Sequence, residues 1–169
     1  VQLTNLFNTP FEQLLKTMIP NALSVSMAGY SFIIPYHIGG FWPGAKPTEE
    51  VYIRMVQASA LMPSMSFSFG PWWYSQNAID ITKKMVQLHQ EHAPTIIALA
   101  KKRVSDGTPI IRPMWYEAPE DPNSFNIDDQ FMLGDDILVA PVVVVGQRQR
   151  SVYIPPGTWI DNHGQPRTG

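Results

Sequence analysis

Two clusters of aromatic and polar side chains have the residue types to bind or act on a ligand. In the first, Tyr36, His37, a glycine pair at 39–40 and Phe41 follow an apolar run at residues 30–34. Polar tips, glycines that permit unusual backbone conformations and a flat ring are typical of the ligand-facing rim of an α/β fold. The alternative is a strand that leaves a core into an ordinary turn.

The second cluster lies after the stretch 64–69, in which serines alternate with large apolar residues. This alternation predicts a strand with Ser68 on one face and Phe67 on the other. Trp72 to Tyr74 then give three adjacent aromatic side chains. Such a patch suits sugar stacking or an apolar ligand, and it suits packing equally well.

The acidic and histidine residues give weaker signals. Glu49 and Glu50 open a predicted helix, where they complement its dipole, and the aspartates at 128–136 lie at predicted turns. His89 and His92 are three residues apart, but no acidic third ligand follows at a matching spacing. We therefore expect no metal site and no cofactor.

The elements that would position these clusters alternate between helix and strand. Helices are predicted at 10–23, with Thr9 as the cap and a break at Pro20, at 48–62, and at 76–104, divided at Pro94. With strands at 30–34 and 64–69, this order predicts a parallel sheet or barrel.

Beyond residue 108 the pattern changes. Short strands are predicted at 109–115, 130–133, 137–145 and 151–154, and no helix signal separates them. We therefore expect an α/β domain at residues 1–108 and an all-β domain at 109–169, with the boundary near Gly107.

Composition limits the class of protein. The 169 residues are 44% hydrophobic and 15% charged, with a net charge of -2 and no cysteine. The high hydrophobic content argues against disorder, and the absence of cysteine excludes disulfides. The slightly negative net charge argues against nucleic acid as a partner. No apolar run approaches the roughly 18 residues of a membrane span. The chain begins at Val1 without a signal peptide, so we expect a piece of a longer protein.

Several stretches resemble glycoside hydrolase family 31. Residues 129–142 and 150–159 are similar to the family's β-sandwich, and residues 107–114 are similar to the chain where it leaves the barrel. Residues 35–41 and 50–63 are similar to the end of strand seven and the helix that follows it. The resemblance implies the C-terminal part of a (β/α)8 TIM barrel followed by the start of a β-sandwich domain.

The resemblance also implies an α-glycosidase in which two carboxylates work by a retaining mechanism. The family's nucleophile would precede Val1, and its acid/base position falls near Leu6, yet no Asp or Glu occurs before Glu12. His37 stands where the family has an aspartate, and Ser68 where it has a sugar-binding histidine.

Phe41 and Arg54 match the family pattern. The expected substrate-binding residues are Tyr36, His37, Phe41, Ser68 and Trp72, and no catalytic residue is assigned within this chain.

Three functions remain open at this stage. The chain is part of an active glycosidase, or a degenerate member that binds carbohydrate or a partner without hydrolysis, or an interaction module that uses Trp72 to Tyr74. The resemblance implies a membrane-anchored parent with its catalytic part on the lumenal or extracellular side. Because part of a barrel leaves sheet edges unpaired, we also expect association with other copies.

Overall fold

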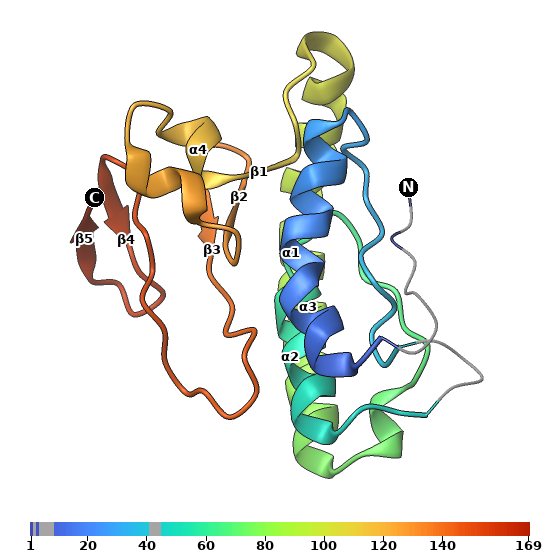
Figure 1. The fold of residues 1–169 in the computed structure, drawn as a ribbon. Coiled ribbons are helices and arrows are strands. Elements are labelled where there is room, and N and C mark those ends of the chain that lie inside the picture. The colour runs from blue at the N-terminus through green and yellow to red at the C-terminus, as the bar shows by residue number, and fades with distance from the viewer. Residues whose placement is uncertain (2, 4–8, 41–44) are drawn as a thin grey trace.

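The computed structural model describes residues 1, 3, 9–40 and 45–169, and its described part forms three layers. Three helices stand in the middle, α1 (Phe11–Met27), α2 (Glu49–Ser59) and α3 (Gln76–Asp106). The extended segments 30–40 and 64–70 run along one side of the helices, and the C-terminal module of small sheets lies on the other (Figure 1).

The extended segments are neighbours, as the β/α rhythm predicts. The Ile34 amide donates to the Val1 carbonyl (2.8 Å), and the Ile34 carbonyl accepts from the Leu3 amide (2.9 Å). Further along, Ile38 forms a parallel bridge with Phe67. The chain therefore contains successive parallel strand segments with only short stretches of regular pairing. The helices that connect them all lie on one side.

Local signals set the starts of two helices. Thr48 caps α2 by accepting from the Val51 amide, as predicted, and Ser75 caps α3 by accepting from the Ala78 amide. The predicted Thr9 cap is wrong, because Pro10 is the N-cap of α1 and no side chain caps that helix. At the far end of α3, Gly107 adopts the left-handed conformation (φ 81°), which few other residues tolerate, and confirms the predicted turn.

The predicted breaks at Pro20 and Pro94 do not occur, since α1 and α3 continue through them. A proline inside a helix releases the carbonyl four residues earlier. Those carbonyls belong to Lys16 and Gln90, which are both exposed, so water can replace the missing donor. Packing of the apolar faces then keeps each helix continuous.

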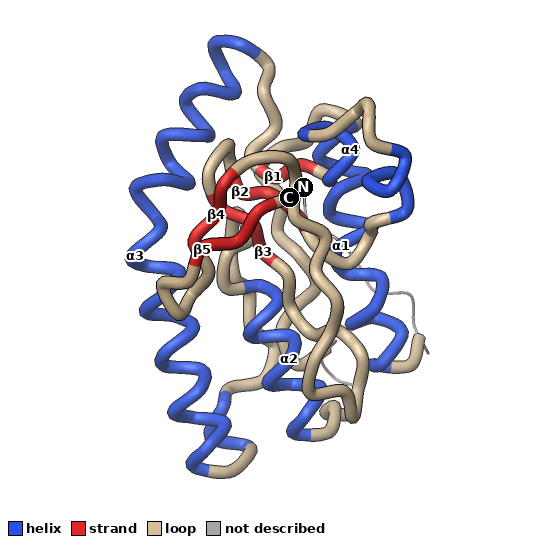
Figure 2. Tube along the Cα trace, turned by 90° about the vertical axis from the view of Figure 1, so that its left-hand side faces the viewer, coloured by secondary structure: helices blue, strands red, loops and turns tan. Residues whose placement is uncertain are grey.

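The C-terminal module is mainly antiparallel. β1 (Ile111–Arg112), β2 (Phe131–Leu133) and β3 (Ile137–Val139) form one sheet in that order, and β4 (Thr158–Ile160) pairs with β5 (Pro166–Thr168). These small sheets lie beside the helices (Figure 2).

Parts of the β prediction were wrong. Residues 151–154 form no strand, the strand predicted at 137–145 ends at Val139, and the stretch predicted at 109–115 ends in the short helix α4 (Met114–Glu117). Outside the predicted strands, 3-10 turns form at η1 (Pro71–Trp73) and η2 (Pro122–Asn126).

One apolar core joins both parts of the chain. Leu15 and Met55 from the helices and Ile111 and Phe131 from the β module belong to the same buried cluster. Polar contacts reinforce it: the buried Ser26 hydroxyl of α1 donates to the Ile111 carbonyl (2.8 Å). The two modules are thus held together along the helices.

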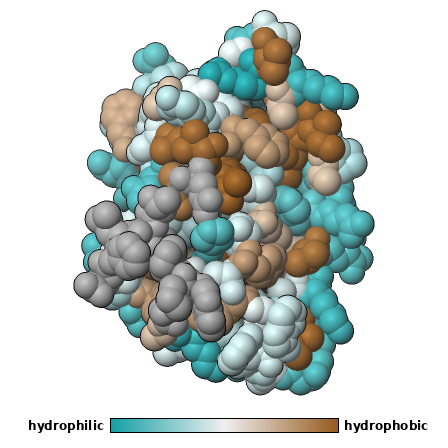
Figure 3. Space-filling model, turned by 90° about the vertical axis from the view of Figure 1, so that its right-hand side faces the viewer, coloured by the Kyte–Doolittle hydropathy of each residue, from teal (hydrophilic) through white to brown (hydrophobic). Residues whose placement is uncertain are grey.

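The face opposite the β module carries exposed apolar side chains. Tyr30, Phe32 and Phe67 of the extended segments are 59%, 55% and 39% exposed, and brown apolar surface gathers on this side (Figure 3). The intervening Ser31 and Ile33 are buried toward the helices. Such alternation is that of strands with helices on one face only. None of the helices in the described ranges is long and apolar enough to cross a membrane.

Candidate functional site: a rim at the ends of two strands

The candidate site, called the rim here, consists of residues 36–40 and 66–70, where two neighbouring strand segments end. Backbone hydrogen bonds fix their register: the Ile38 amide donates to the Ser66 carbonyl (2.7 Å), and the Ser68 amide donates to the Ile38 carbonyl (3.0 Å). In parallel β/α folds, ligands bind at the carboxyl ends of strands. The rim is therefore where this architecture places a ligand site.

His37 and Ser66 come together although 29 residues separate them in sequence. The imidazole Nδ1 of His37 lies 2.7 Å from the Ser66 hydroxyl. The Ser68 hydroxyl donates to the Ile38 carbonyl (3.1 Å), which leaves its oxygen able to accept. The rim thus presents hydroxyl and imidazole groups that can donate and accept hydrogen bonds.

The glycine pair allows the rim to pack tightly. Gly39 and Gly40 have φ of 96° and 91°, in the left-handed region. A Cβ atom at Gly39 would lie 2.8 Å from the Cβ of Phe69, and one at Gly40 would lie 2.4 Å from Cε1 of Phe11. Backbone conformation and space both demand glycine here.

The other predicted site residues lie in different surroundings. The Tyr36 ring is buried and its hydroxyl accepts from the Asn21 side chain of α1, so it faces the helices rather than His37. Phe41, and Leu6 near the expected acid/base position, lie outside the described residues. Trp72 stands in the turn η1 beyond Ser68, and 74% of it is exposed.

A second loop holds the aromatic turn in place. The Lys46 ammonium donates to the Trp73 carbonyl (2.9 Å), and the Tyr74 hydroxyl donates to the Pro47 carbonyl (3.1 Å). Glu49 accepts from both the amide (3.0 Å) and the hydroxyl (2.7 Å) of Ser75. The loops that follow the two strand segments are therefore bound to each other.

Electrostatics argue against the nearby carboxyl groups as proton donors. Hydrogen bonds from Ser75 lower the pKa of Glu49. Hydrogen bonds from the Gly146 amide and from Arg54 lower the pKa of Glu50. Both stay ionised and serve structural contacts. In the same loops, burial, with Tyr52 and Glu49 nearby, raises the pKa of Tyr74 to about 12.

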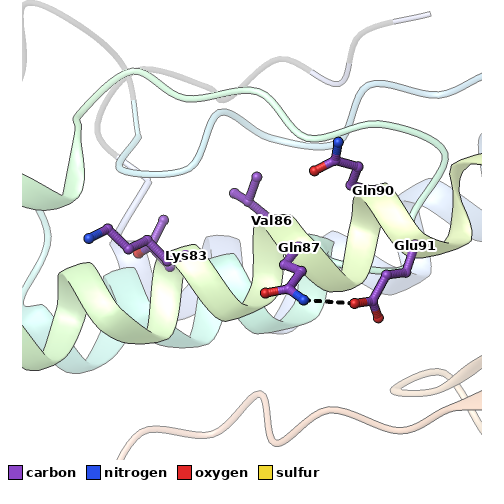
Figure 4. Close-up of a pocket in the computed structure, with 6 residues that line it drawn as sticks. Lys83, Val86, Gln87, Gln90 and Glu91 are labelled. Atoms are coloured by element: carbon purple, nitrogen blue, oxygen red, sulfur yellow. Dashed lines mark hydrogen bonds between the residues drawn. The ribbon is translucent and has the colours of Figure 1, made fainter.

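Two hollows open beside the rim. One, of about 460 Å³, is lined by residues of the strand end, the aromatic turn and α3, among them Phe67, Ser68, Trp72 and Thr82. The other, of about 710 Å³, runs along α3, where Gln87 donates to Glu91 at 2.9 Å (Figure 4). They share Thr82 and Val86 and so lie next to each other.

No cluster of three or more metal-ligating side chains occurs in the ranges that the structure describes. His89 contacts the Ala60 carbonyl at the end of α2 (2.9 Å), and His92 contacts the Leu88 carbonyl within its own helix (2.9 Å). Each of the two therefore has a structural partner at one ring nitrogen.

Parallel strand segments with returning helices, a rim at their carboxyl ends and an appended antiparallel module define part of a TIM-barrel enzyme fold with a following β domain. The family model for the glycosyl hydrolases family 31 TIM-barrel domain matches residues 8–99, and that for the family 31 C-terminal domain matches 107–169. The chain belongs to glycoside hydrolase family 31, and it contains the end of the barrel and the start of the sandwich.

Similar proteins agree with this assignment. Myogenesis-regulating glycosidase of Mus musculus is 40% identical over 161 residues, 89% of this chain and 22% of its own length. SITS-binding protein of Tetronarce californica is also 40% identical, over 87% of this chain and 22% of its own length.

Among solved structures, a family 31 dextranase of Flavobacterium johnsoniae, complexed with glucose, has a TM-score of 0.86 and 29% identity, covering 94% of this chain and 21% of its own. The chain thus spans about a fifth of the length of these relatives.

Reasoning from sequence missed two parts of the site. In the sequence Ser66 is one of three alternating serines with nothing to distinguish it, and its contact with His37 depends on strand register. The Lys46, Tyr74 and Glu49 contacts between the loops left no local pattern. The substrate-binding roles of Tyr36, His37, Phe41, Ser68 and Trp72 stay predictions.

Proposed function

We propose that this chain forms one side of the sugar-binding cleft of a family 31 glycosidase that hydrolyses α-linked glycosides. The observation that carries the proposal is the rim, where His37 contacts Ser66 and Ser68 binds the Ile38 carbonyl, at the carboxyl ends of adjacent strand segments. Hydroxyl and imidazole groups suit sugar hydroxyls, which both donate and accept hydrogen bonds.

The proposed chemistry is retaining hydrolysis by two carboxylates, one as nucleophile and one as acid/base. Neither is assigned to this chain, and the nucleophile is proposed to lie upstream in the longer protein. The chain would orient the sugar ring, since positioning lowers the barrier for groups supplied from elsewhere.

The decisive experiment measures hydrolysis of 4-nitrophenyl α-glucoside and α-galactoside by the full-length protein and its His37→Ala variant. Loss of an orienting hydrogen bond should lower kcat/KM by about tenfold or more. Arg167→Ala is the control, because that side chain is exposed in the distant β4–β5 hairpin. An unchanged rate in the His37 variant would refute the role of the rim.

A second candidate is a member of the family that binds sugar without hydrolysing it. The specific observation concerns Glu49 and Glu50, the carboxylates that lie between the two rim segments in sequence. Ser75 donates to Glu49, and Arg54 and the Gly146 amide donate to Glu50, so both carboxylates are engaged in structural contacts. Under this proposal the full-length protein binds saccharides in calorimetry but releases no nitrophenol, and measurable turnover excludes it.

The location is a separate proposal. We propose a lumenal or extracellular position in a membrane-anchored parent, on the resemblance alone. Protease protection of the parent protein in sealed membrane vesicles would test it.

Association with other copies, proposed from the exposed face with Tyr30 and Phe32, would show as a concentration-dependent mass in light scattering.

A further inference from the structure

The hollow beside the aromatic turn differs from the rim in its lining. It contains Phe67, Phe69, Trp72 and Val86 with the hydroxyls of Ser68 and Thr82, and no charged side chain from the described residues lines it. His37 is not among these lining residues. Its volume of about 460 Å³ lies within the range of small-molecule sites. A neutral ligand with both apolar and hydroxyl surface fits this lining.

The Trp72 indole lies against the backbone of Gly70. A Cβ atom at Gly70 would be 2.2 Å from Cζ2 of the indole, closer than two nonbonded carbon atoms can approach. The backbone of Gly70 is ordinary (φ -81°, ψ 156°), so its conformation does not require glycine. The ring does, because only a residue without a side chain lets it lie over the backbone.

The turn that carries Trp72 is also held from outside. Lys46 binds the carbonyl of the next residue, Trp73, and Glu49 binds Ser75, two residues further on. An aromatic ring that is 74% exposed and yet anchored loses little freedom when a ligand covers it. The exposed ring is therefore a prearranged platform.

The two hydroxyls of the hollow point to the kind of ligand. Ser68 donates to the Ile38 carbonyl (3.1 Å) and Thr82 to the Ala78 carbonyl (2.7 Å). Both protons are used. The Thr82 side chain is buried and also contacts the Tyr52 phenol, so Ser68 is the hydroxyl whose oxygen can accept from a ligand hydroxyl. A pyranose ring offers an apolar C–H face for an indole and hydroxyl donors at its edge.

We propose that this hollow binds a second sugar ring of a saccharide whose first ring occupies the rim at His37. Ser68 belongs to both places, so it stands at their junction. The inference rests on the proposed function, because it assumes that the rim binds sugar. It adds a neighbouring subsite with Trp72 as the stacking residue.

The test compares monosaccharide with trisaccharide binding by titration calorimetry on the full-length protein. Glucose with isomaltotriose, and galactose with raffinose, serve as probes. For the trisaccharide that the wild-type protein binds, Trp72→Ala should lower the affinity about tenfold, or about 1.4 kcal/mol. The affinity for the matching monosaccharide should stay unchanged. Trp72→Phe should retain most of the affinity, because it keeps a flat ring.

Two further variants separate this role from a general effect on the turn. Gly70→Ala should weaken the trisaccharide as Trp72→Ala does, because the new methyl displaces the indole. Trp73→Ala should leave both sugars unchanged, because the Trp73 ring packs edge-on against Phe69 (6.2 Å between centroids) and does not line the hollow. Thermal unfolding of each variant checks that the protein stays folded.

Equal losses for monosaccharide and trisaccharide in Trp72→Ala, or no loss for either, would overturn the subsite. His37→Ala tests the rim separately: if it changes neither sugar while Trp72→Ala weakens only the trisaccharide, the rim fails as the first-ring site and the Trp72 hollow stands as a separate sugar site. If the wild-type protein binds none of the four probes, both proposals fall.

Discussion

Replacing Arg54 with methionine would remove the cation that ties the loop 142–147 to α2. The Arg54 side chain is almost fully buried, and it donates to Glu50 (2.7 Å), to the Val142 carbonyl (2.9 Å) and to the Gln147 carbonyl. Methionine keeps much of the apolar volume, so the change tests the polar contacts rather than the packing.

The magnitude follows from those contacts. A hydrogen bond to a charged group contributes about 1.5–3 kcal/mol, and two of these bonds reach the loop backbone. Because the freed carbonyls regain some water, we expect the loop to lose about 3 kcal/mol of local stability. This corresponds to hydrogen exchange that is faster by on the order of a hundredfold.

Hydrogen–deuterium exchange of the peptide that spans the loop is the assay. The Gly146 amide, bound to Glu50 (2.8 Å), and the Gln147 amide, bound to the Val144 carbonyl (3.3 Å), are the reporters. Arg167→Met is the matched control, because it breaks an exposed pair with Asp161 that should contribute less than about 1 kcal/mol. Unchanged exchange at both reporter amides in Arg54→Met would refute the reasoning.

Three other predictions concern buried polar groups. Ser26→Ala should cost about 1–2 kcal/mol in urea unfolding, because it orphans a buried carbonyl. Ser31→Ala should be neutral or stabilising, since that buried hydroxyl has no hydrogen-bond partner among the described residues, and a cost similar to that of Ser26→Ala would contradict this. The Tyr74 phenol should ionise with a midpoint near 12 in absorbance titration, and a midpoint at its usual value of 10.0 would exclude the buried environment.

A further prediction uses pH. Burial raises the pKa of Glu117 above its usual 4.5, so the folded state binds more protons than the unfolded chain just above that pH. The stability that the protonated Glu117 contributes is therefore lost as pH rises through its raised pKa. In thermal unfolding scans, Glu117→Gln should flatten the decrease of the melting temperature with pH over this range. An identical slope in the variant would contradict it.

The sequence predicts those features of the structure whose interacting residues are close together in the chain. The Thr48 cap was predictable because the partner amide is three residues away. The breaks expected at Pro20 and Pro94 fail because tertiary packing outweighs one lost helical hydrogen bond. The β4–β5 hairpin was missed because most of it is exposed, so it shows no apolar alternation.

The candidate site follows the same rule. The position of the rim was predictable, since the apolar runs and the glycine pair mark where the strand segments end. The contact between His37 and Ser66 was not, because it depends on the register of two segments that are distant in the chain. Loop-to-loop contacts such as that of Lys46 with Trp73 arise only once those strands are side by side.

The bonds between the two rim loops have a consequence for protein engineering. Because Lys46, Pro47 and Glu49 hold the backbone or side chains of residues 73–75, neither loop keeps its shape when it is exchanged alone. A chimera with another family 31 barrel should therefore transfer both loops together in one cassette. Suitable crossover points lie before the rim in α1 and after it in α3.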